Sequence, residues 1–253
     1  MNRVISPSLG SSPLIFLDFD GVVCDSESEC YVSSWLTFQN ITRDSKNPGH
    51  SVDHIELLSR ERFRQMRPLI RSGEDYVVIQ DILARKEIEK EFKLPLTQDD
   101  FDVYRNSLGK KLVSTYKSAM LETRNKFISN NRSDWLSLNY LYPHMYHLLT
   151  TRDLSNVRIL STKDTGLVIE ILHANHIFIP AGCIFHADSN PAEIDTRKLD
   201  MISQYLDLST ASRALFVEDQ IDHLIDNSDS RITTYLADWG YVLPRWLTDK
   251  ERQ

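Results

Sequence analysis

The sequence has few cysteines and no long apolar segment. Its three cysteines are an odd number without the paired spacing of a zinc site: Cys24, Cys30 and Cys183. We therefore expect no disulfide framework and a reducing compartment. No stretch approaches the roughly 20 apolar residues of a membrane-spanning helix, and the apolar run near the N-terminus is too short for the core of a signal peptide. These absences predict a soluble, cytoplasmic protein.

Basic residues are also scarce relative to acidic ones. The chain has 29 Lys and Arg against 36 Asp and Glu, which gives a formal net charge of −7. Because nucleic-acid binding needs a basic face, this balance argues against nucleic acid as the main partner. A small phosphorylated substrate is compatible with it, since a local cluster and a metal ion can meet its charge. At 253 residues, with 41% hydrophobic content, the chain can form one large domain or two of moderate size.

The most informative stretch is residues 14–26, LIFLDFDGVVCDS. Its apolar run predicts a buried strand, and that strand ends on Asp18 and Asp20. Gly21 follows at once and permits a sharp turn. In open α/β sheets the chemistry lies beyond the carboxyl ends of the strands, and neighbouring carboxylates repel unless a cation holds them. The alternative interpretation is a surface turn, in which Asp and Gly are common.

A helix-rich block separates this strand from a later alternation of strands and helices. Within the block, helices are predicted over residues 57–66, 76–92 and 99–128, with Pro68 ending the first and Thr97 as an N-cap. Later strands are predicted over residues 157–161, 182–186, 214–217 and 232–237, with helices over 164–174 and 197–206. The alternation predicts a doubly wound, Rossmann-like α/β core of residues 1–26 and 140–253, with 27–139 as an inserted helical domain.

Three of the predicted strands end on polar residues of complementary type. These residues are Asp18 and Asp20, then Ser161, Thr162 and Lys163, then Glu218 and Asp219. Because the carboxyl ends of parallel strands lie on one edge of a sheet, the acids are expected to face a hydroxyl and an amine. Such a carboxylate cluster suits Mg²⁺, a hard ion that takes oxygen ligands and keeps waters for phosphate oxygens.

DFDGVVCDS resembles the first motif of the haloacid dehalogenase-like (HAD) superfamily. The resemblance implies that Asp18 is a nucleophile that takes a phosphoryl group, and that Asp20 is the acid and base of the reaction. LSTKD resembles the second motif, with Ser161 hydrogen-bonding the phosphoryl oxygens and Thr162 beside it. FVEDQIDHL resembles the fourth motif in its acidic-pair form. The implied Mg²⁺ ligands are Asp18, Asp20 through its backbone carbonyl, and Asp219, with Glu218 adjacent.

Two positions of these motifs leave alternatives open. Lys198 is the best match to the lysine of the third motif, which offsets the charge of nucleophile and phosphate, but Arg197 and Lys163 compete with it. Many relatives carry a further Asp four positions after the Asp of this acidic pair, which is Asp219 here. Here that position is His223, and the nearest acid is Asp222, which could act in an outer position or cap a helix.

The resemblance implies an Mg²⁺-dependent phosphatase of a small phosphate monoester, with the helical block as a cap that selects the substrate. Asp20 argues against dehalogenases and phosphonate hydrolases of this superfamily. A phosphomutase and a non-catalytic binding protein remain alternatives, and a homo-oligomer is left open. Arg67 and Arg71 are candidate contacts to an anionic substrate group, although a solvated basic face is the simpler interpretation of their spacing. Trp239-Gly240-Tyr241, in YLADWGY, is predicted to be packing and a turn.

Overall fold

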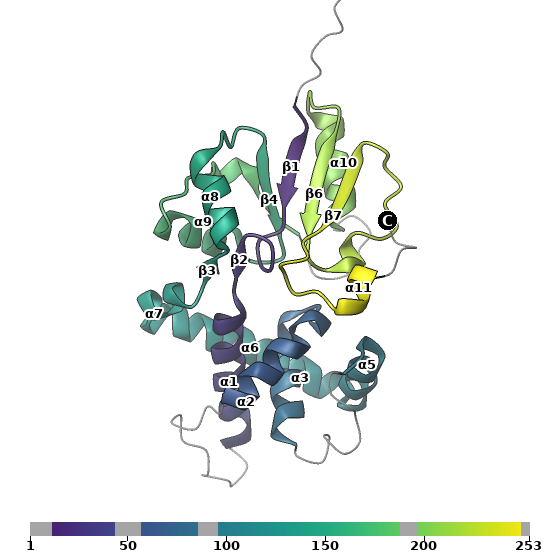
Figure 1. Cartoon of the computed structure of the whole chain (residues 1–253). Coiled ribbons are helices and arrows are strands. Elements are labelled where there is room, and N and C mark those ends of the chain that lie inside the picture. The colour runs from purple at the N-terminus through teal and green to yellow at the C-terminus, as the bar shows by residue number, and fades with distance from the viewer. Residues whose placement is uncertain (1–11, 44–56, 86–95, 188–196, 249–253) are drawn as a thin grey trace, which may run out of the picture. The chain divides into compact units, whose positions relative to one another are not determined.

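The chain folds into two compact units in the computed structural model, which describes residues 12–43, 57–85, 96–187 and 197–248 (Figure 1). Residues 1–24 and 141–253 form one unit, and residues 25–140 form the other. The helical insertion predicted over residues 27–139 falls within the second unit. The short strands β2 (Cys24–Asp25) and β3 (Tyr140–Leu141) pair with each other at the chain positions where the two units divide.

The first unit is built on a five-stranded sheet with the order β5-β4-β1-β6-β7, and every neighbouring pair is parallel. Its strands are β1 (Leu14–Leu17), β4 (Val157–Ser161), β5 (Ile184–His186), β6 (Ala214–Glu218) and β7 (Ile232–Leu236). β1 is the central strand and is hydrogen-bonded on both edges. A continuous apolar sequence is what a central parallel strand requires. The predicted α/β, Rossmann-like fold is confirmed.

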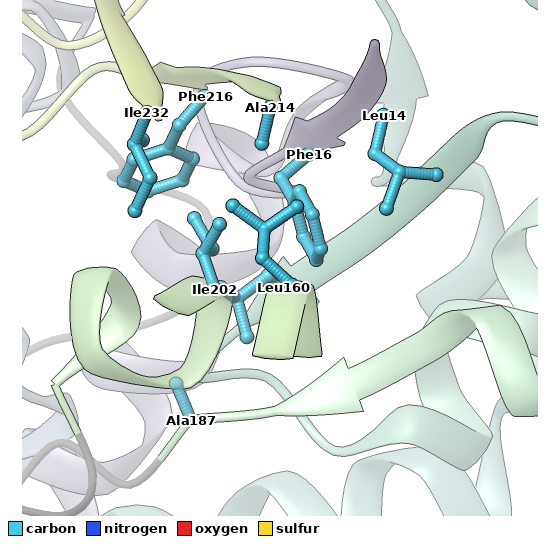
Figure 2. Close-up of a cluster of buried hydrophobic side chains, with 9 residues drawn as sticks. Leu14, Phe16, Leu160, Ala187, Ile202, Ala214, Phe216 and Ile232 are labelled. Atoms are coloured by element: carbon cyan, nitrogen blue, oxygen red, sulfur yellow. The ribbon is translucent and has the colours of Figure 1, made fainter. Parts of the chain in front are cut away.

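Helices alternate with the strands of this unit along the chain. They are α8 (Pro143–Thr151), α9 (Thr165–Ala174) and α10 (Lys198–Leu208), and the short α11 (Pro244–Thr248) follows the last strand. Leu14 and Phe16 point to the same face because side chains alternate along a strand, and they form a buried cluster with Phe216 of β6 (Figure 2). Ile202 of α10 belongs to the same cluster. This packing fixes α10, and therefore the residue that begins it, against the sheet.

The second unit is helical in the part of it that the structure describes. Its α-helices are α1 (Glu27–Arg43), α2 (Leu57–Met66), α3 (Gly73–Ala84), α5 (Gln98–Ser107), α6 (Gly109–Asn130) and α7 (Arg132–Ser137). Pro68 lies in a 3₁₀ turn, Arg67–Leu69, directly after α2, as expected of a residue that cannot continue the hydrogen-bond pattern of a helix. Thr97 caps α5, since its hydroxyl accepts from the Asp100 N–H at 3.1 Å. α1, α3 and α6 pack against one another.

Several predicted elements differ from the structure by a residue or more at their ends, and two of these differences have a local cause. The strand predicted from residue 182 begins at Ile184, because Ala181–Cys183 forms a 3₁₀ turn after Pro180. The helix predicted over 76–92 begins earlier, at Gly73, where Ser72 and Asp75 form a capping box, and it ends at Ala84; residues 86–92 of that prediction lie outside the described residues. Across the described chain, no helix combines the length and apolar character needed to cross a membrane.

Candidate active site

Asp18 and Asp20 lie just beyond the carboxyl end of the central strand β1. The chain turns sharply there, with the Gly21 N–H donating to the Cys24 carbonyl at 2.8 Å and the Val23 N–H donating to the Phe19 carbonyl at 2.9 Å. Gly21 has a φ of +89°, and a Cβ at this position would collide with the carboxylate of Asp219. The turn therefore requires glycine at this position, because the backbone has a positive φ and because Asp219 approaches too closely for a side chain.

Lys198, the first residue of α10, joins two strand ends. Its buried Nζ lies 2.8 Å from Oδ1 of Asp18 and 2.6 Å from Oε2 of Glu218. Of the three cations considered for the third motif, Lys198 is the one in contact with Asp18. Arg197 is exposed and pairs with Asp200 on its own helix at 2.8 Å. The structure thus places Lys198 where an amine can balance the charge of Asp18.

Lys163 contacts the other aspartate of the first motif. Its Nζ lies 2.8 Å and 3.2 Å from the two carboxylate oxygens of Asp20, and it also lies over the ring of Phe19. Ser161, at the end of β4, is buried, and its Oγ accepts from the Lys163 N–H at 3.2 Å. Thr162 is exposed. The second-motif segment therefore supplies a buried hydroxyl and an ammonium group at the edge where Asp18 and Asp20 lie.

Glu218 and Asp219, at the end of β6, are both buried but have different surroundings. Glu218 accepts from Lys198, from Nδ1 of His223 at 3.1 Å, and from the backbone N–H groups of Asp219 and Gln220, each at 3.1 Å. Asp219 accepts at Oδ2 from the backbone N–H of Tyr241 at 2.9 Å. Glu218 is thus surrounded by donors on both oxygens.

His223 occupies the position at which the resemblance to the fourth motif led us to expect an Asp. It ends the 3₁₀ turn Ile221–His223, and this turn directs its imidazole to Glu218. Asp222 is exposed on the same turn. Among the described residues, the grouping of acids that could hold a metal ion is Asp18, Glu218 and Asp219, with one oxygen from each within 4.8 Å of the others.

Burial and charge shift the pKa values of this cluster in opposite directions. Burial and the charge of Glu218 raise the pKa of Asp18 to about 6, against the opposing charge of Lys198. Burial also acts to raise the pKa of Glu218, but Lys198 and His223 outweigh it and hold that pKa well below its ordinary range. The pKa of Lys198 lies above its ordinary value because the two acids outweigh the effect of burial. The three acids of this cluster can therefore carry more negative charge than the single ammonium group of Lys198 can neutralise.

Arg67 and Arg71 belong to the helical unit, and their described contacts lie within it. Arg67 is buried, and its guanidinium lies 5.0 Å from the centre of the Tyr76 ring. Arg71 forms two hydrogen bonds to the carboxylate of Asp102, at 2.9 Å and 3.1 Å. Arg71 is exposed, as a solvated basic face predicts, whereas the burial of Arg67 differs from that interpretation. Whether either arginine meets a substrate stays a prediction.

Sequence reasoning missed three contacts of the site. The pairings of Lys163 with Asp20 and of the Tyr241 N–H with Asp219 join segments that follow different strands. His223 and Glu218 are only five residues apart and meet because of the 3₁₀ turn after β6. The one available signal was the position of Lys163, two residues after the hydroxyl that ends β4. No periodic pattern marks the other two.

Comparison with known proteins places the fold. No protein-family model matches the sequence, and no curated protein matches it. Among solved structures, a haloacid dehalogenase-like hydrolase from Bacteroides fragilis matches with a TM-score of 0.55 and 12% identity, covering 94% of this chain and 93% of that one. A predicted phosphoglycolate phosphatase from Haemophilus somnus matches with a TM-score of 0.53 and 15% identity, covering 96% and 94% of the two chains. The chain has the fold of the haloacid dehalogenase-like superfamily.

Proposed function

We propose that this protein is an Mg²⁺-dependent phosphatase that hydrolyses a small phosphate monoester through an aspartyl-phosphate on Asp18. The observation that carries the proposal is the buried contact of Lys198 with both Asp18 and Glu218 at the carboxyl edge of the sheet. A carboxylate held beside an ammonium group, with a second acid two residues away, suits nucleophilic attack on phosphorus followed by hydrolysis. Solved structures with the same fold that are described as predicted phosphoglycolate phosphatases agree with this class of reaction.

The residues present fit a magnesium ion. Asp18 and Asp219 are buried acids with oxygen atoms close to each other, and carboxylate and carbonyl oxygens are the ligands that Mg²⁺ prefers. Both oxygens of Glu218 already accept hydrogen bonds, so we assign it to holding Lys198 rather than the metal. The ion would be held by Asp18, the backbone carbonyl of Asp20 and Asp219. When bound, it would offset the charge of the incoming phosphate and of the acids around it.

The residues of this chain divide the chemistry between them. An oxygen of Asp18 forms a bond to phosphorus while the bond from phosphorus to the leaving alcohol breaks, and Asp20 gives the alcohol its proton. Asp20 then takes a proton from water as the water oxygen bonds to phosphorus and the bond to Asp18 breaks. Lys198 balances the negative charge of the phosphoryl oxygens, and the Ser161 hydroxyl forms a hydrogen bond to them. Because Asp20 is paired with Lys163 in the structure, it must take up a proton and loosen this pair before it can act as an acid.

The helical unit is proposed to act as the cap that selects the alcohol part of the substrate. A cap can exclude water and recognise the leaving group while the sheet edge performs the chemistry. Arg67 and Arg71 are the proposed contacts to an anionic group of the substrate. If Arg71 has this role, Arg71→Ala should raise KM with little change in kcat, whereas unchanged kinetics would exclude it.

The test is phosphate release from a panel of phosphorylated metabolites, with phosphoglycolate among them, in Mg²⁺ and in EDTA. Wild type is compared with Asp18→Asn and with Asp200→Asn, a matched control on the exposed side of α10 that pairs with Arg197. Turnover that needs Mg²⁺, is lost in Asp18→Asn and persists in Asp200→Asn is the expected result. Equal release from wild type and Asp18→Asn would refute the assignment of the nucleophile. Conversion of a substrate to its isomer without release of phosphate would identify a phosphomutase.

A further inference from the structure

The turn Trp239–Tyr241, after β7, contacts two parts of the proposed cation site. These are the loop that follows Asp20 and the carboxylate of Asp219. The turn is anchored to β6, because the Ala237 N–H donates to the Glu218 carbonyl at 2.8 Å and the Gly240 N–H donates to the Ala237 carbonyl at 3.0 Å. It therefore lies beside the end of the strand that supplies Asp219. Packing and a turn were the roles predicted for it, and its contacts also reach the carboxylate of Asp219.

The indole of Trp239 binds the loop that follows Asp20. Its Nε1–H donates to the backbone carbonyl of Val22 at 3.1 Å, and Val22 is fully buried. The same ring system makes a T-shaped contact with the ring of His144, with centroids 4.7 Å apart. The indole thus contacts α8 on one side and, on the other, the loop of residues 21–23 after Asp20, which we call the nucleophile loop.

Gly240 and Tyr241 contact Asp219, the residue that directly follows β6. The Tyr241 N–H donates to Oδ2 of Asp219 at 2.9 Å, which fixes the rotation of that carboxylate. A Cβ on Gly240 would collide with the carbonyl oxygen of Gly21 and with Cβ of Asp219. The glycine therefore allows the turn, the nucleophile loop and Asp219 to approach one another more closely than any other residue would permit.

We propose that Trp239 is a positioning residue, which, through the turn it begins, preorganises the nucleophile loop and Asp219 to bind a divalent cation. This inference rests on the proposed function, since it concerns the same metal site. The physical reason is repulsion: Asp18, Glu218 and Asp219 bring oxygens within 4.8 Å of one another, and like charges at that distance move apart unless they are held. A loop fixed at Val22 and a carboxylate fixed at Oδ2 retain the ligand geometry before the ion arrives, as outer partners of metal ligands commonly do.

The experiment measures Mn²⁺ binding to the substrate-free full chain, by the electron paramagnetic resonance signal of the free ion. Trp239→Phe removes the Nε1–H donor and keeps an aromatic ring. Trp239→His restores a donor at Nε2, which is as many bonds from the backbone as the indole nitrogen, although the smaller ring packs less well. Trp246→Phe makes the same change at a tryptophan of α11 and is the matched control. Melting temperatures in EDTA are recorded for all variants.

Trp239→Phe is expected to weaken Mn²⁺ binding by roughly tenfold or more, and Trp246→Phe to leave it unchanged. Trp239→His is expected to bind Mn²⁺ more tightly than Trp239→Phe, even if it melts at a lower temperature. Equal affinity in wild type and Trp239→Phe would overturn the inference while leaving the metal site intact. So would affinities that simply follow the melting temperatures, because that pattern means that Trp239 only stabilises the fold. Failure of wild type to bind Mn²⁺, or binding unaffected by Asp18→Asn, would instead refute the metal site of the proposed function.

Discussion

Removing the charge of Asp18 should stabilise the protein when no metal is bound. Asp18 is buried beside Glu218, and together these raise its pKa to about 6, compared with an ordinary value of 3.8. A pKa raised by folding means that the folded state disfavours the ionised form. Asp18→Asn removes this unfavourable charge, and its amide oxygen can still accept from Lys198. The nucleophile of the proposed reaction is therefore also a source of instability.

The magnitude follows from the change in pKa. At 1.36 kcal/mol for each pKa unit, the rise from 3.8 to about 6 corresponds to about 3 kcal/mol for this fully buried group. Below about pH 4, Asp18 is protonated in both the folded and unfolded states, so the substitution has no effect through this charge. Between about pH 4 and pH 6 the unfolded chain loses its proton first and the folded state is progressively penalised. Above pH 6 the advantage of Asp18→Asn is complete.

The assay is urea unfolding of both proteins in EDTA at several pH values from 4 to 8, repeated with Mg²⁺. We expect the advantage of Asp18→Asn to grow with pH and level off, and Mg²⁺ to stabilise wild type but not the variant. Wild type more stable than Asp18→Asn in EDTA at pH 8 would refute the reasoning, because it would show that Lys198 more than offsets the cost of burying the charge.

Asp229 provides a control for which the expected change in stability has the opposite sign. Hydrogen bonds from Arg231 and Ser203 hold the pKa of Asp229 below its ordinary range. Its ionised form therefore stabilises the fold above its unfolded pKa, and that contribution is lost as pH falls. Asp229→Asn should destabilise the protein at pH 7, with the difference from wild type shrinking in acid. If both substitutions gave the same pH dependence, neither could be attributed to the group replaced.

Three further substitutions test the packing and the chemistry. Gly21→Ala should cost roughly 1–3 kcal/mol and weaken Mn²⁺ binding, because its Cβ would displace the carboxylate of Asp219; unfolding and metal titrations measure both. Arg124→Met should cost roughly 3–5 kcal/mol, because it leaves Glu29 buried without the guanidinium that now lies 2.9 Å away, and adding Glu29→Met should recover much of the loss in urea unfolding. Asp20→Asn should lower kcat roughly 100-fold to 10,000-fold in phosphate-release assays, whereas an unchanged kcat would exclude it as the acid and base.

The sheet and the strand-end residues of the site could be predicted because they leave local signals. Each apolar run that ends on an acid or a hydroxyl is visible in a few consecutive residues, and this holds for β1, β4 and β6. The alternation of strands with helices then determines that they are parallel, and parallel strands bring their carboxyl ends to one edge. The residues named for that edge thus followed from patterns within each segment.

The contacts between those residues could not be predicted, because they depend on packing between distant segments. Lys198, Arg197 and Lys163 are all cations near predicted helix starts, and the sequence favours Lys198 without excluding the other two. The packing of α10 on the sheet directs Lys198 to Asp18, and the turn after β4 directs Lys163 to Asp20, which is 143 residues away. The same reason explains why the spacing of the arginines suggested a solvated face, although Arg67 is buried against the ring of Tyr76.

The order of the strands has a consequence for the synthesis of the chain. β1 is made first, but its neighbours β4 and β6 follow only after the helical insertion, and Lys198 contacts Asp18 across 180 residues. On the ribosome, the apolar segment Leu14–Leu17 must remain unpaired until most of the chain has emerged. During that time it is exposed and can associate with other chains. The helical insertion can fold in the meantime from its own residues. Nascent chains that end before β6 should therefore be the form most dependent on chaperones.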